Sequence, residues 1–389
     1  MNKKLISNIE RKRLAEIKGF LKSENIPLTS LVKIKGDASF RVYYRINNTD
    51  LILMDANPRT NEKVSSFIKI QKILSEYGIN VPKIYKKDVS LGLMIIQDLG
   101  KKRFVDYVNR ETILGSMDIL SQIHSKSIEM PSKIKNIKKY TLNEQMKETD
   151  LFFSWYLKKH LKKTISKKEK DSFKTIFKKI YKELNIKNYC LVLRDFHMDN
   201  IIPMPEMDSS NGRDVPISSM NELGLIDFQD ALVGSPAYDC SSFIDDVRSP
   251  IIREKDERTI FKGQHSVNLS LNIRLREKKI KGDKEPSIVW RRKKELERLY
   301  KEKIEDINVV LKLNNTAYHA LKNFNRQVDY FSIQRNLKIL GIFCRLKYRD
   351  KKSNYIKYLP RAKKFIRENL KNPEFKELRN WFIENKINV

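Results

Sequence analysis

The pattern of apolar residues changes once along the chain, near residue 100, and this change limits the possible folds most strongly. Short apolar or alternating runs bounded by turn residues predict β-strands before that point. These runs are Leu31–Lys35, Phe40–Ile46, Leu51–Asp55, Val81–Tyr85 and Leu93–Gln97. Helical spacing predicts helices over 5–22 and Glu62–Tyr77. The first part is therefore a small antiparallel sheet with a helix inserted after its third strand.

From Arg103 onward the pattern is mostly helical. Helices are predicted over Glu111–Lys126, Leu142–Lys163, Lys167–Leu184, 293–314, 316–329, 332–347, 360–370 and 374–385. Two short apolar strands, Tyr189–Leu193 and Leu223–Ile226, each run directly into a polar cluster. The predicted fold class is α+β, with a sheet-rich part over 1–100 and a helical part over 101–389. Polar loops at strand ends are where catalytic groups commonly lie.

Two segments have the composition of surface insertions. Residues 204–221 hold prolines and a run of Asp, Ser, Asn and Gly, which is typical of a loop. Residues 250–292 are basic and only weakly periodic. The second segment could be a nucleic-acid-binding arm, but a tolerated insertion without a chemical role is the favoured interpretation.

The chain is strongly basic, with 79 Lys and Arg against 48 Asp and Glu and a formal net charge of +31. Clustered positive charge can indicate a nucleic-acid or membrane partner. Here the charge is spread from end to end, together with heavy use of Ile and Asn, as an AT-rich genome would impose. We therefore do not expect a nucleic-acid partner.

Three cysteines, Cys190, Cys240 and Cys344, lie far apart and form no C-x-x-C pair. This spacing argues against structural disulfides and a zinc site, and it fits a reducing compartment. The first ten residues hold lysines but no apolar secretory segment. No run approaches the roughly 18 apolar residues of a membrane span. We expect a cytoplasmic protein.

Two motifs carry the strongest chemical signal. Leu193–Asn200 contains D-x-x-x-x-N, from Asp195 to Asn200, and Asp227 follows the next apolar strand. Phosphoryl transfer requires a residue that orients the attacking hydroxyl and oxygen ligands that hold magnesium. One such motif alone usually marks a solvated turn. The pair, each member at a strand end, is specific and points to phosphoryl transfer.

These residues resemble the phosphotransferase superfamily that includes aminoglycoside phosphotransferases, choline kinases and, distantly, protein kinases. Asp195 matches its catalytic-loop base, and His197 matches the histidine of its D-x-H-x-x-N loop. Asn200 and Asp227 match its metal-binding residues. The resemblance implies a bilobal, protein-kinase-like fold with an antiparallel-sheet N-lobe and a helical C-lobe. It also implies ATP and Mg²⁺ as cofactors.

Further segments resemble one bacterial subfamily, that of the anomeric kinases for N-acetylmuramate and N-acetylglucosamine. The matching segments are Gly36–Arg45, Leu53–Ala56, Gln97–Gly100, Asp227–Gly234, Tyr238-Asp239 and Gln334–Leu346. The match runs from near residue 30 to the C-terminus, apart from the two insertions.

The resemblance also implies a nucleotide site. Gly36, Ala38 and Ser39 would belong to a hairpin whose backbone N–H groups approach phosphate oxygens. Gln97 and Leu99 would flank the hinge whose backbone meets adenine. Without the resemblance, the first segment would be interpreted as an ordinary turn and the second as the end of a strand.

The chain departs from the superfamily at two positions. Met54 stands where a phosphate-binding lysine is expected, and Arg41 or Arg45 on the neighbouring strand could supply that charge. An exposed strand arginine is the equal alternative. Leu193 replaces a histidine that is common in relatives. Asp239 resembles a buried aspartate that braces the catalytic loop.

Other polar residues are expected to have structural roles. His124, His160, His265 and His319 lack metal-ligand spacing. Asp245-Asp246 could face an acceptor, but a helix surface is the favoured interpretation.

The sequence therefore predicts an ATP-dependent phosphotransferase for a small-molecule hydroxyl. By the resemblance this is the anomeric hydroxyl of an amino sugar, in cell-wall sugar recycling. The alternatives are an aminoglycoside- or choline-type kinase, or a degenerate kinase fold that binds nucleotide or nucleic acid without catalysis. The presence of Asp195, Asn200 and Asp227 together argues against degeneration.

Overall fold

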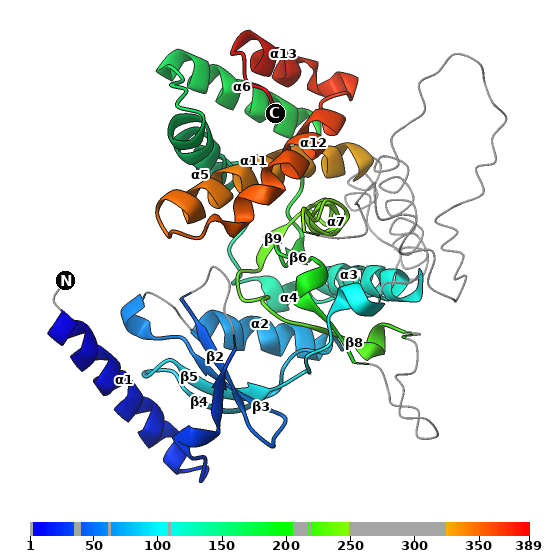
Figure 1. Ribbon diagram of the computed structural model, residues 1–389. Helices are drawn as coiled ribbons and strands as arrows, with labels where there is room; N and C mark the ends of the chain where they lie inside the picture. Colours follow the sequence, from blue (N-terminus) through cyan, green and yellow to red (C-terminus); the bar gives the residue numbers. More distant parts are fainter. Residues whose placement is uncertain are drawn as a thin grey trace, which may run out of the picture. The chain divides into compact units, whose positions relative to one another are not determined.

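A computed structural model describes residues 3–34, 40–60, 64–107, 110–204, 217, 219–248 and 324–389 (Figure 1). The chain forms two compact units. The first comprises Met1–Arg103, Ile202–Val215 and Asn221–Asp230, and the second comprises Phe104–Ile201, Pro216–Met220 and Ala231–Val389. The first unit contains a five-stranded sheet, and most described helices belong to the second. The predicted α+β fold class is confirmed.

The first unit is built on an antiparallel sheet with strand order β1-β2-β3-β5-β4. Its elements are α1 (Lys3–Lys22), β1 (Leu31–Lys33), β2 (Val42–Ile46), β3 (Leu51–Asp55), α2 (Val64–Glu76), β4 (Ile84–Asp88), β5 (Leu93–Gln97) and β8 (Leu223–Leu225). β8 pairs with β7 (Ile201–Pro203) in a separate two-stranded sheet. The expected strand over Val81–Tyr85 begins later, at Ile84. Pro82, which lacks an N–H group, precedes it and cannot donate to a ladder.

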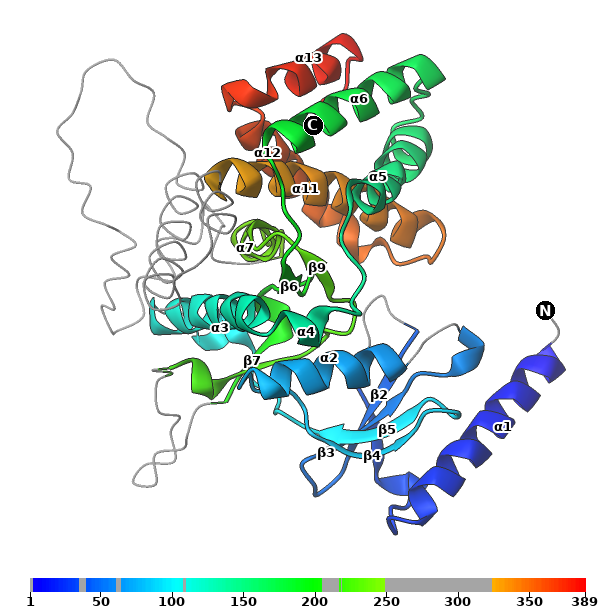
Figure 2. The same ribbon diagram turned by 180° about the vertical axis from the view of Figure 1, so that it is seen from behind.

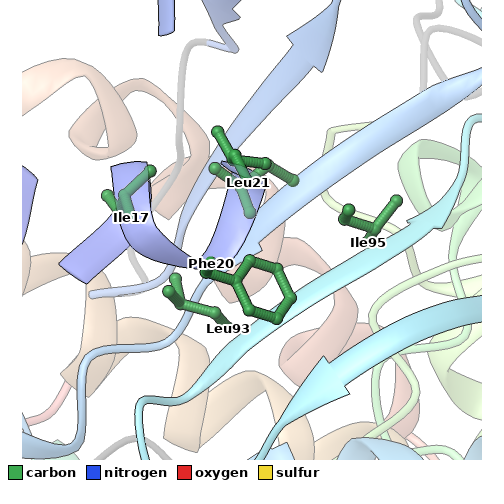
Figure 3. Packing of buried hydrophobic residues seen from close by; sticks show 6 residues of the cluster. Ile17, Phe20, Leu21, Leu93 and Ile95 are labelled. Atoms are coloured by element: carbon green, nitrogen blue, oxygen red, sulfur yellow. The ribbon is translucent and has the colours of Figure 1, made fainter. Parts of the chain in front are cut away.

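Helix α1 packs on one face of this sheet. The apolar cluster that joins them consists of Ile17, Phe20, Leu21, Leu53, Leu93 and Ile95, each no more than 7% exposed (Figure 3). Side chains alternate across a strand, so Met54 and Met94, both fully buried, point to the opposite face. Figure 2 shows α2 alongside that face. The sheet is therefore covered by a helix on both sides.

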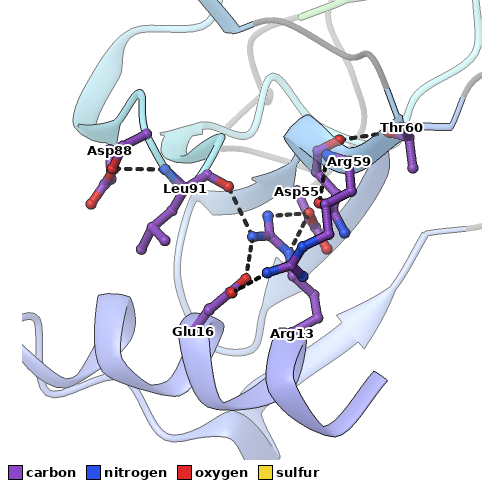
Figure 4. A network of polar contacts seen from close by, with 9 residues as sticks. Arg13, Glu16, Asp55, Arg59, Thr60, Asp88 and Leu91 are labelled. Carbon is purple, nitrogen blue, oxygen red and sulfur yellow. Dashed lines mark hydrogen bonds and ion pairs between the residues drawn. The ribbon is translucent and has the colours of Figure 1, made fainter. Parts of the chain in front are cut away.

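A buried ion pair fixes α1 to the end of β3 (Figure 4). Arg13 donates to Asp55 Oδ1 from Nε at 3.0 Å and from Nη2 at 2.5 Å. Its Nη1 reaches Glu16 at 2.9 Å and the Leu91 carbonyl at 2.8 Å. Burial alone would lower the pKa of Arg13, but the bonds to Asp55 and Glu16 raise it overall. The carboxylate that follows Met54 is thus a structural partner of α1.

The second unit is mostly helical. Its main elements are α3 (Arg110–Glu129), α4 (Pro131–Ile134), α5 (Leu142–Leu151), η4 (Phe152–His160), α6 (Lys167–Glu183), β6 (Cys190–Val192), η5 (Met198–Asn200), β9 (Leu232–Gly234), α7 (Ala237–Ile244), α11 (Phe324–Tyr348), η8 (Ser353–Tyr358), α12 (Leu359–Asn369) and α13 (Lys376–Glu384). β6 and β9 pair antiparallel, with Cys190 opposite Gly234. Among the described helices, none is long and apolar enough to cross a membrane.

Helix α11 corrects one prediction. The sequence predicts a break between helices 316–329 and 332–347, but α11 is continuous from Phe324 to Tyr348. The helix is buried on most sides and includes the buried polar residues Gln334, Arg335 and Lys338. Its apolar residues therefore do not lie along a single face, as they do in an amphipathic helix. The predicted helix 293–314 and most of both predicted insertions lie outside the described residues.

A π-helix interrupts another predicted helix. The expected α-helix over Leu142–Lys163 is an α-helix only to Leu151, and the π-helix η4 continues it for nine residues. α11 approaches this junction closely, since a Cβ atom on Gly341 would lie 2.4 Å from the Leu151 carbonyl carbon. Only glycine allows this approach of the two backbones.

Candidate active site

The catalytic-loop segment of the second unit begins after the buried strand β6. Arg194 has a positive φ of 71°, which turns the chain sharply before Asp195. The short helix η5 then brings Asn200 back toward the start of the loop. Its backbone N–H donates to the His197 carbonyl at 2.9 Å, and its Nδ2 donates to the Asp195 carbonyl at 2.9 Å. Asp195 and Asn200 are thereby held together.

Asp239, on α7, holds the start of this loop. Its side chain is fully buried and accepts hydrogen bonds from the backbone N–H groups of Leu193 at 2.6 Å and Arg194 at 2.8 Å. His124 Nε2 lies 3.8 Å from the same carboxylate. Two backbone amides that no strand partner satisfies are therefore paired with one carboxylate.

Several positive groups surround Asp195 within the second unit. Glu148 on α5 forms an ion pair with Arg194 and lies 3.4 Å from Lys338 Nζ. Burial would raise the pKa of Asp195, but the neighbouring basic groups, Lys338 first and then His197, Arg194 and Arg335, outweigh it and lower that pKa to about 2. Asp195 is therefore ionised at neutral pH. Lys338 falls in a segment that the sequence singles out, whereas Glu148 lies in an ordinary polar helix and carries no sequence signal.

His197 is buried and uncharged in this arrangement. Arg248 donates to its imidazole ring and also lies 3.2 Å from Asp199. Burial and then the Arg248 charge lower the pKa of His197 well below its usual value. A neutral His197 can accept from Arg248 on one ring nitrogen.

The helix-surface interpretation of Asp245-Asp246 is wrong. Both side chains are 1% exposed. Asp245 accepts a hydrogen bond from the Ser332 hydroxyl, and Asp246 accepts one from the Arg248 backbone N–H at 3.0 Å. Ser332 is distant in sequence, and the Arg248 N–H is brought back by a turn. These hydrogen bonds allow the two carboxyl groups to be buried.

Asp227 lies in the first unit, directly after β8. Leu225 N–H donates to the Asn80 carbonyl at 2.8 Å, which fixes the end of that strand. Phe228 packs on Phe67 of α2 with ring centroids 4.9 Å apart. Asp227 itself has a φ of 58°, a left-handed conformation that Asp tolerates. The ring anchors the segment and leaves the neighbouring carboxylate about half exposed, at 47%.

The structure distinguishes the two strand arginines. Arg41 Nη2 lies 3.8 Å from Asp227 Oδ1 and 4.0 Å from Asp230 Oδ2. Arg45 instead donates to Asp98 at 2.5 Å and to the Gly100 carbonyl at 2.9 Å. Of the two, Arg41 is therefore the arginine beside the Asp227 carboxylate, and Arg45 supports the segment after β5.

That segment holds the predicted hinge residues. Gln97 N–H donates to the Lys83 carbonyl at 2.9 Å. Leu99 packs over Gly224 of β8, where a Cβ atom would lie 2.6 Å from the leucine Cδ1. The predicted phosphate hairpin, with Gly36, Ala38 and Ser39, lies outside the described residues.

The donors of Asn200 and Asp227 fit magnesium by their chemistry. Asn200 uses Nδ2 internally, so its Oδ1 is the end that can serve a cation. Asp227 offers a half-exposed carboxylate. Within the described ranges, no group of three or more His, Cys, Asp or Glu could hold a metal alone. Mg²⁺ is usually bound by one or two protein oxygens together with phosphates and water, and Asn200 and Asp227 each offer an oxygen of this kind.

A family model for the phosphotransferase enzyme family matches residues 30–261, more than half of the chain. The chain belongs to this family. The prediction of a phosphotransferase, a small-molecule kinase, is thereby confirmed.

Known phosphotransferases resemble the chain over most of its length. The N-acetylmuramate/N-acetylglucosamine kinase of Pseudomonas aeruginosa is 25% identical over 360 residues, covering 91% of this chain and 88% of that protein. Among solved structures, choline kinase LicA from Streptococcus pneumoniae has a TM-score of 0.50 and 12% identity, covering 91% and 98% of the two chains. ADP-bound aminoglycoside phosphotransferase APH(2'')-Ib has the same TM-score and identity, covering 94% and 98%. The predicted fold family is confirmed.

Proposed function

We propose that this phosphotransferase transfers the γ-phosphoryl group of ATP to the anomeric hydroxyl of an amino sugar, in the recycling of cell-wall sugars. The catalytic loop carries the proposal, because it holds an ionised Asp195 beside the amide of Asn200. The sugar acceptor is supported by the relative from Pseudomonas aeruginosa, whose name states that activity. Residues Asp195, Asn200 and Asp227 would perform the reaction.

Asp195 would orient the acceptor hydroxyl toward the phosphoryl group. A carboxylate with a pKa near 2 is a weak base, so it takes the proton late, as the bond to phosphorus forms. This suits phosphoryl transfer, in which positioning and charge stabilisation dominate. Mg²⁺, held by Asn200 and Asp227, would supply neutralisation of charge on the phosphates.

Other residues would position the nucleotide. Arg41 would contact phosphate, since it is the strand arginine nearest the Asp227 carboxylate and its guanidinium can bind phosphate with two N–H groups. The backbone near Gly36, Ala38 and Ser39 would cover the phosphates. Gln97 and Leu99 would flank the segment that meets adenine. His197 and Asp239 would hold the loop rather than touch the reacting atoms.

An amino-sugar acceptor is favoured over a choline- or aminoglycoside-type acceptor by the relative from Pseudomonas aeruginosa, whose match covers 91% of this chain. The catalytic-loop geometry, with an ionised Asp195 beside Asn200, argues against a degenerate kinase fold.

The test is an acceptor panel with ATP and Mg²⁺: N-acetylmuramate, N-acetylglucosamine, choline and an aminoglycoside. We expect ADP release with the two amino sugars and a phosphate on the anomeric carbon, read by phosphorus NMR. Asp195→Asn should lose at least about 10²-fold in kcat, because it removes the group that orients the hydroxyl. Activity with choline alone, or full activity of Asp195→Asn, would contradict the proposal.

A further inference from the structure

A cavity of about 350 Å³ lies in the second unit between η4, η8 and α12. Tyr156 and His160 line it from η4, with ring centroids 5.7 Å apart and an interplanar angle of 29°. Leu161 and Ile356 add apolar surface. Its volume is at the lower end of the range of small-molecule sites, roughly 300–1,000 Å³. The cavity therefore suits a small ligand with an apolar part.

The charged groups of this cavity are all basic. Lys363 and Arg367, one turn apart on α12, line it, and none of its lining residues is acidic. Arg367 donates to the backbone carbonyl of Val389 at 2.9 Å. Within the part of the chain that the structure describes, Lys363 pairs with no carboxylate.

The cations repel one another. Burial and then Arg367 lower the pKa of Lys363. Burial, Lys347 and Lys363 lower the pKa of His160. Such repulsion destabilises the fold, and positive groups gathered around a concave surface whose lining side chains include no carboxylate have the arrangement of an anion site.

The backbone of η4 gives a second, independent indication. Leu161 N–H donates to the Tyr156 carbonyl at 2.9 Å, five residues back. This wide turn places the Tyr156 and His160 rings together on the cavity wall, and His160 Nδ1 lies 3.1 Å from the Tyr348 hydroxyl. Long π-helices are rare, and π-turns occur frequently at functional sites. The nine-residue π-helix thus supplies two side chains of the cavity wall, Tyr156 and His160.

We propose that this cavity binds a small organic anion: a phosphate, sulfonate or carboxylate on an apolar body. Lys363 and Arg367 bind the anionic group, and the apolar body lies against His160 and Leu161. None of these residues belongs to the catalytic loop or the Asp227 segment. The site is therefore separate from the proposed phosphoryl transfer and does not depend on it.

The test uses two fluorescent probes that share their rings and differ in charge. 8-Anilinonaphthalene-1-sulfonate carries the anion, and N-phenyl-1-naphthylamine does not. Titrations contain saturating Mg²⁺ and a non-hydrolysable ATP analogue, so that the nucleotide site is occupied. We expect one sulfonate probe per chain, with the neutral probe at least about tenfold weaker because it lacks the charge-assisted bonds.

Variants locate the site. Lys363→Gln/Arg367→Gln should weaken sulfonate binding at least about tenfold. The matched control Lys364→Gln/Lys371→Gln removes equal charge from or beside the same helix without touching the lining, and it should stay within about twofold. Lys363→Gln alone keeps the Arg367 bond to Val389, so it tests the site if the double variant folds poorly. Equal binding by wild type and Lys363→Gln, equal binding of both probes, or no binding of the sulfonate probe while the nucleotide site is occupied would overturn the proposal.

Discussion

Glu148 lets the stability of the catalytic-loop region be tested quantitatively. Its carboxylate pairs with Arg194, lies 3.4 Å from Lys338 Nζ, and accepts hydrogen bonds from Tyr140 at 2.5 Å and Gln334 at 3.2 Å. Burial would raise the pKa of Glu148, but Lys338 and Arg194 lower it overall. One carboxylate therefore serves two buried cations, and its loss leaves both without that partner.

Glu148→Gln keeps the shape and one acceptor oxygen but removes the charge. Breaking a buried ion pair from one side costs about 3–5 kcal/mol. We expect about 3 kcal/mol, the lower end, because the Glu148 side chain keeps 15% exposure and Gln still accepts from Tyr140. Lys338→Met in the same chain removes one of the stranded cations, so the double variant should recover at least about 1 kcal/mol.

The assay is equilibrium unfolding in urea, followed by circular dichroism and by the fluorescence of the three tryptophans, of which Trp155 and Trp381 lie in described helices of the second unit. Glu144→Gln is the matched control: the same change on the same helix, at a residue paired with surface Lys138 and Lys147. It should leave the midpoint nearly unchanged. If Glu148→Gln shifts stability by less than about 1 kcal/mol, or no more than the control, the buried network does not stabilise the fold as argued.

Three further outcomes are expected. Asp239→Ala leaves two buried backbone N–H groups without an acceptor, so it should destabilise the protein by about 2–4 kcal/mol in urea unfolding. It should also lower kcat at least about tenfold, with nucleotide affinity unchanged. An unchanged kcat would contradict the role of Asp239 in holding the catalytic loop. Gly341→Ala forces a Cβ onto Leu151 and should cost about 1–3 kcal/mol by calorimetry, whereas Gly19→Ala, with nothing within 4 Å, should be neutral or stabilising. The folded pKa of His197 is lowered, so the unfolded chain binds more protons below about pH 6.5. The contribution of neutral His197 to the free energy of unfolding is therefore complete above that pH and falls as the pH decreases toward the folded pKa. His197→Asn should flatten the dependence of the urea midpoint on pH in this range. An unaltered pH dependence would contradict the burial of a neutral His197.

The sheet of the first unit could be predicted because its signals are local. The β3 and β5 strands have the predicted bounds, Leu51–Asp55 and Leu93–Gln97, since each is a short apolar run bounded by turn residues. α11 could not be divided correctly, because a helix buried all round loses the one-sided pattern on which helix prediction depends.

The candidate site shows the same contrast between local and tertiary signals. Asp195, Asn200 and Asp227 stand at fixed spacing after short strands, so the sequence alone singles them out. Glu148 joins Arg194 and Lys338 only through tertiary contacts, which no local pattern reports. The prediction that Asp245 and Asp246 lie on a helix surface failed for the same reason, because their burial depends on hydrogen bonds from Ser332 and from the Arg248 backbone.

The packing of α1 on the sheet, through the Arg13–Asp55 ion pair and the apolar cluster, has a practical consequence for choosing domain limits. The family match begins at residue 30, whereas α1 ends at Lys22. Starting the protein at residue 30 would remove Arg13 and leave Asp55 a buried carboxylate without its guanidinium. It would also expose the apolar sheet face around Leu53 and Leu93 to solvent, and such an exposed apolar surface favours aggregation. The boundary of evolutionary similarity and the boundary of the folding unit are therefore different, and expression should follow the second.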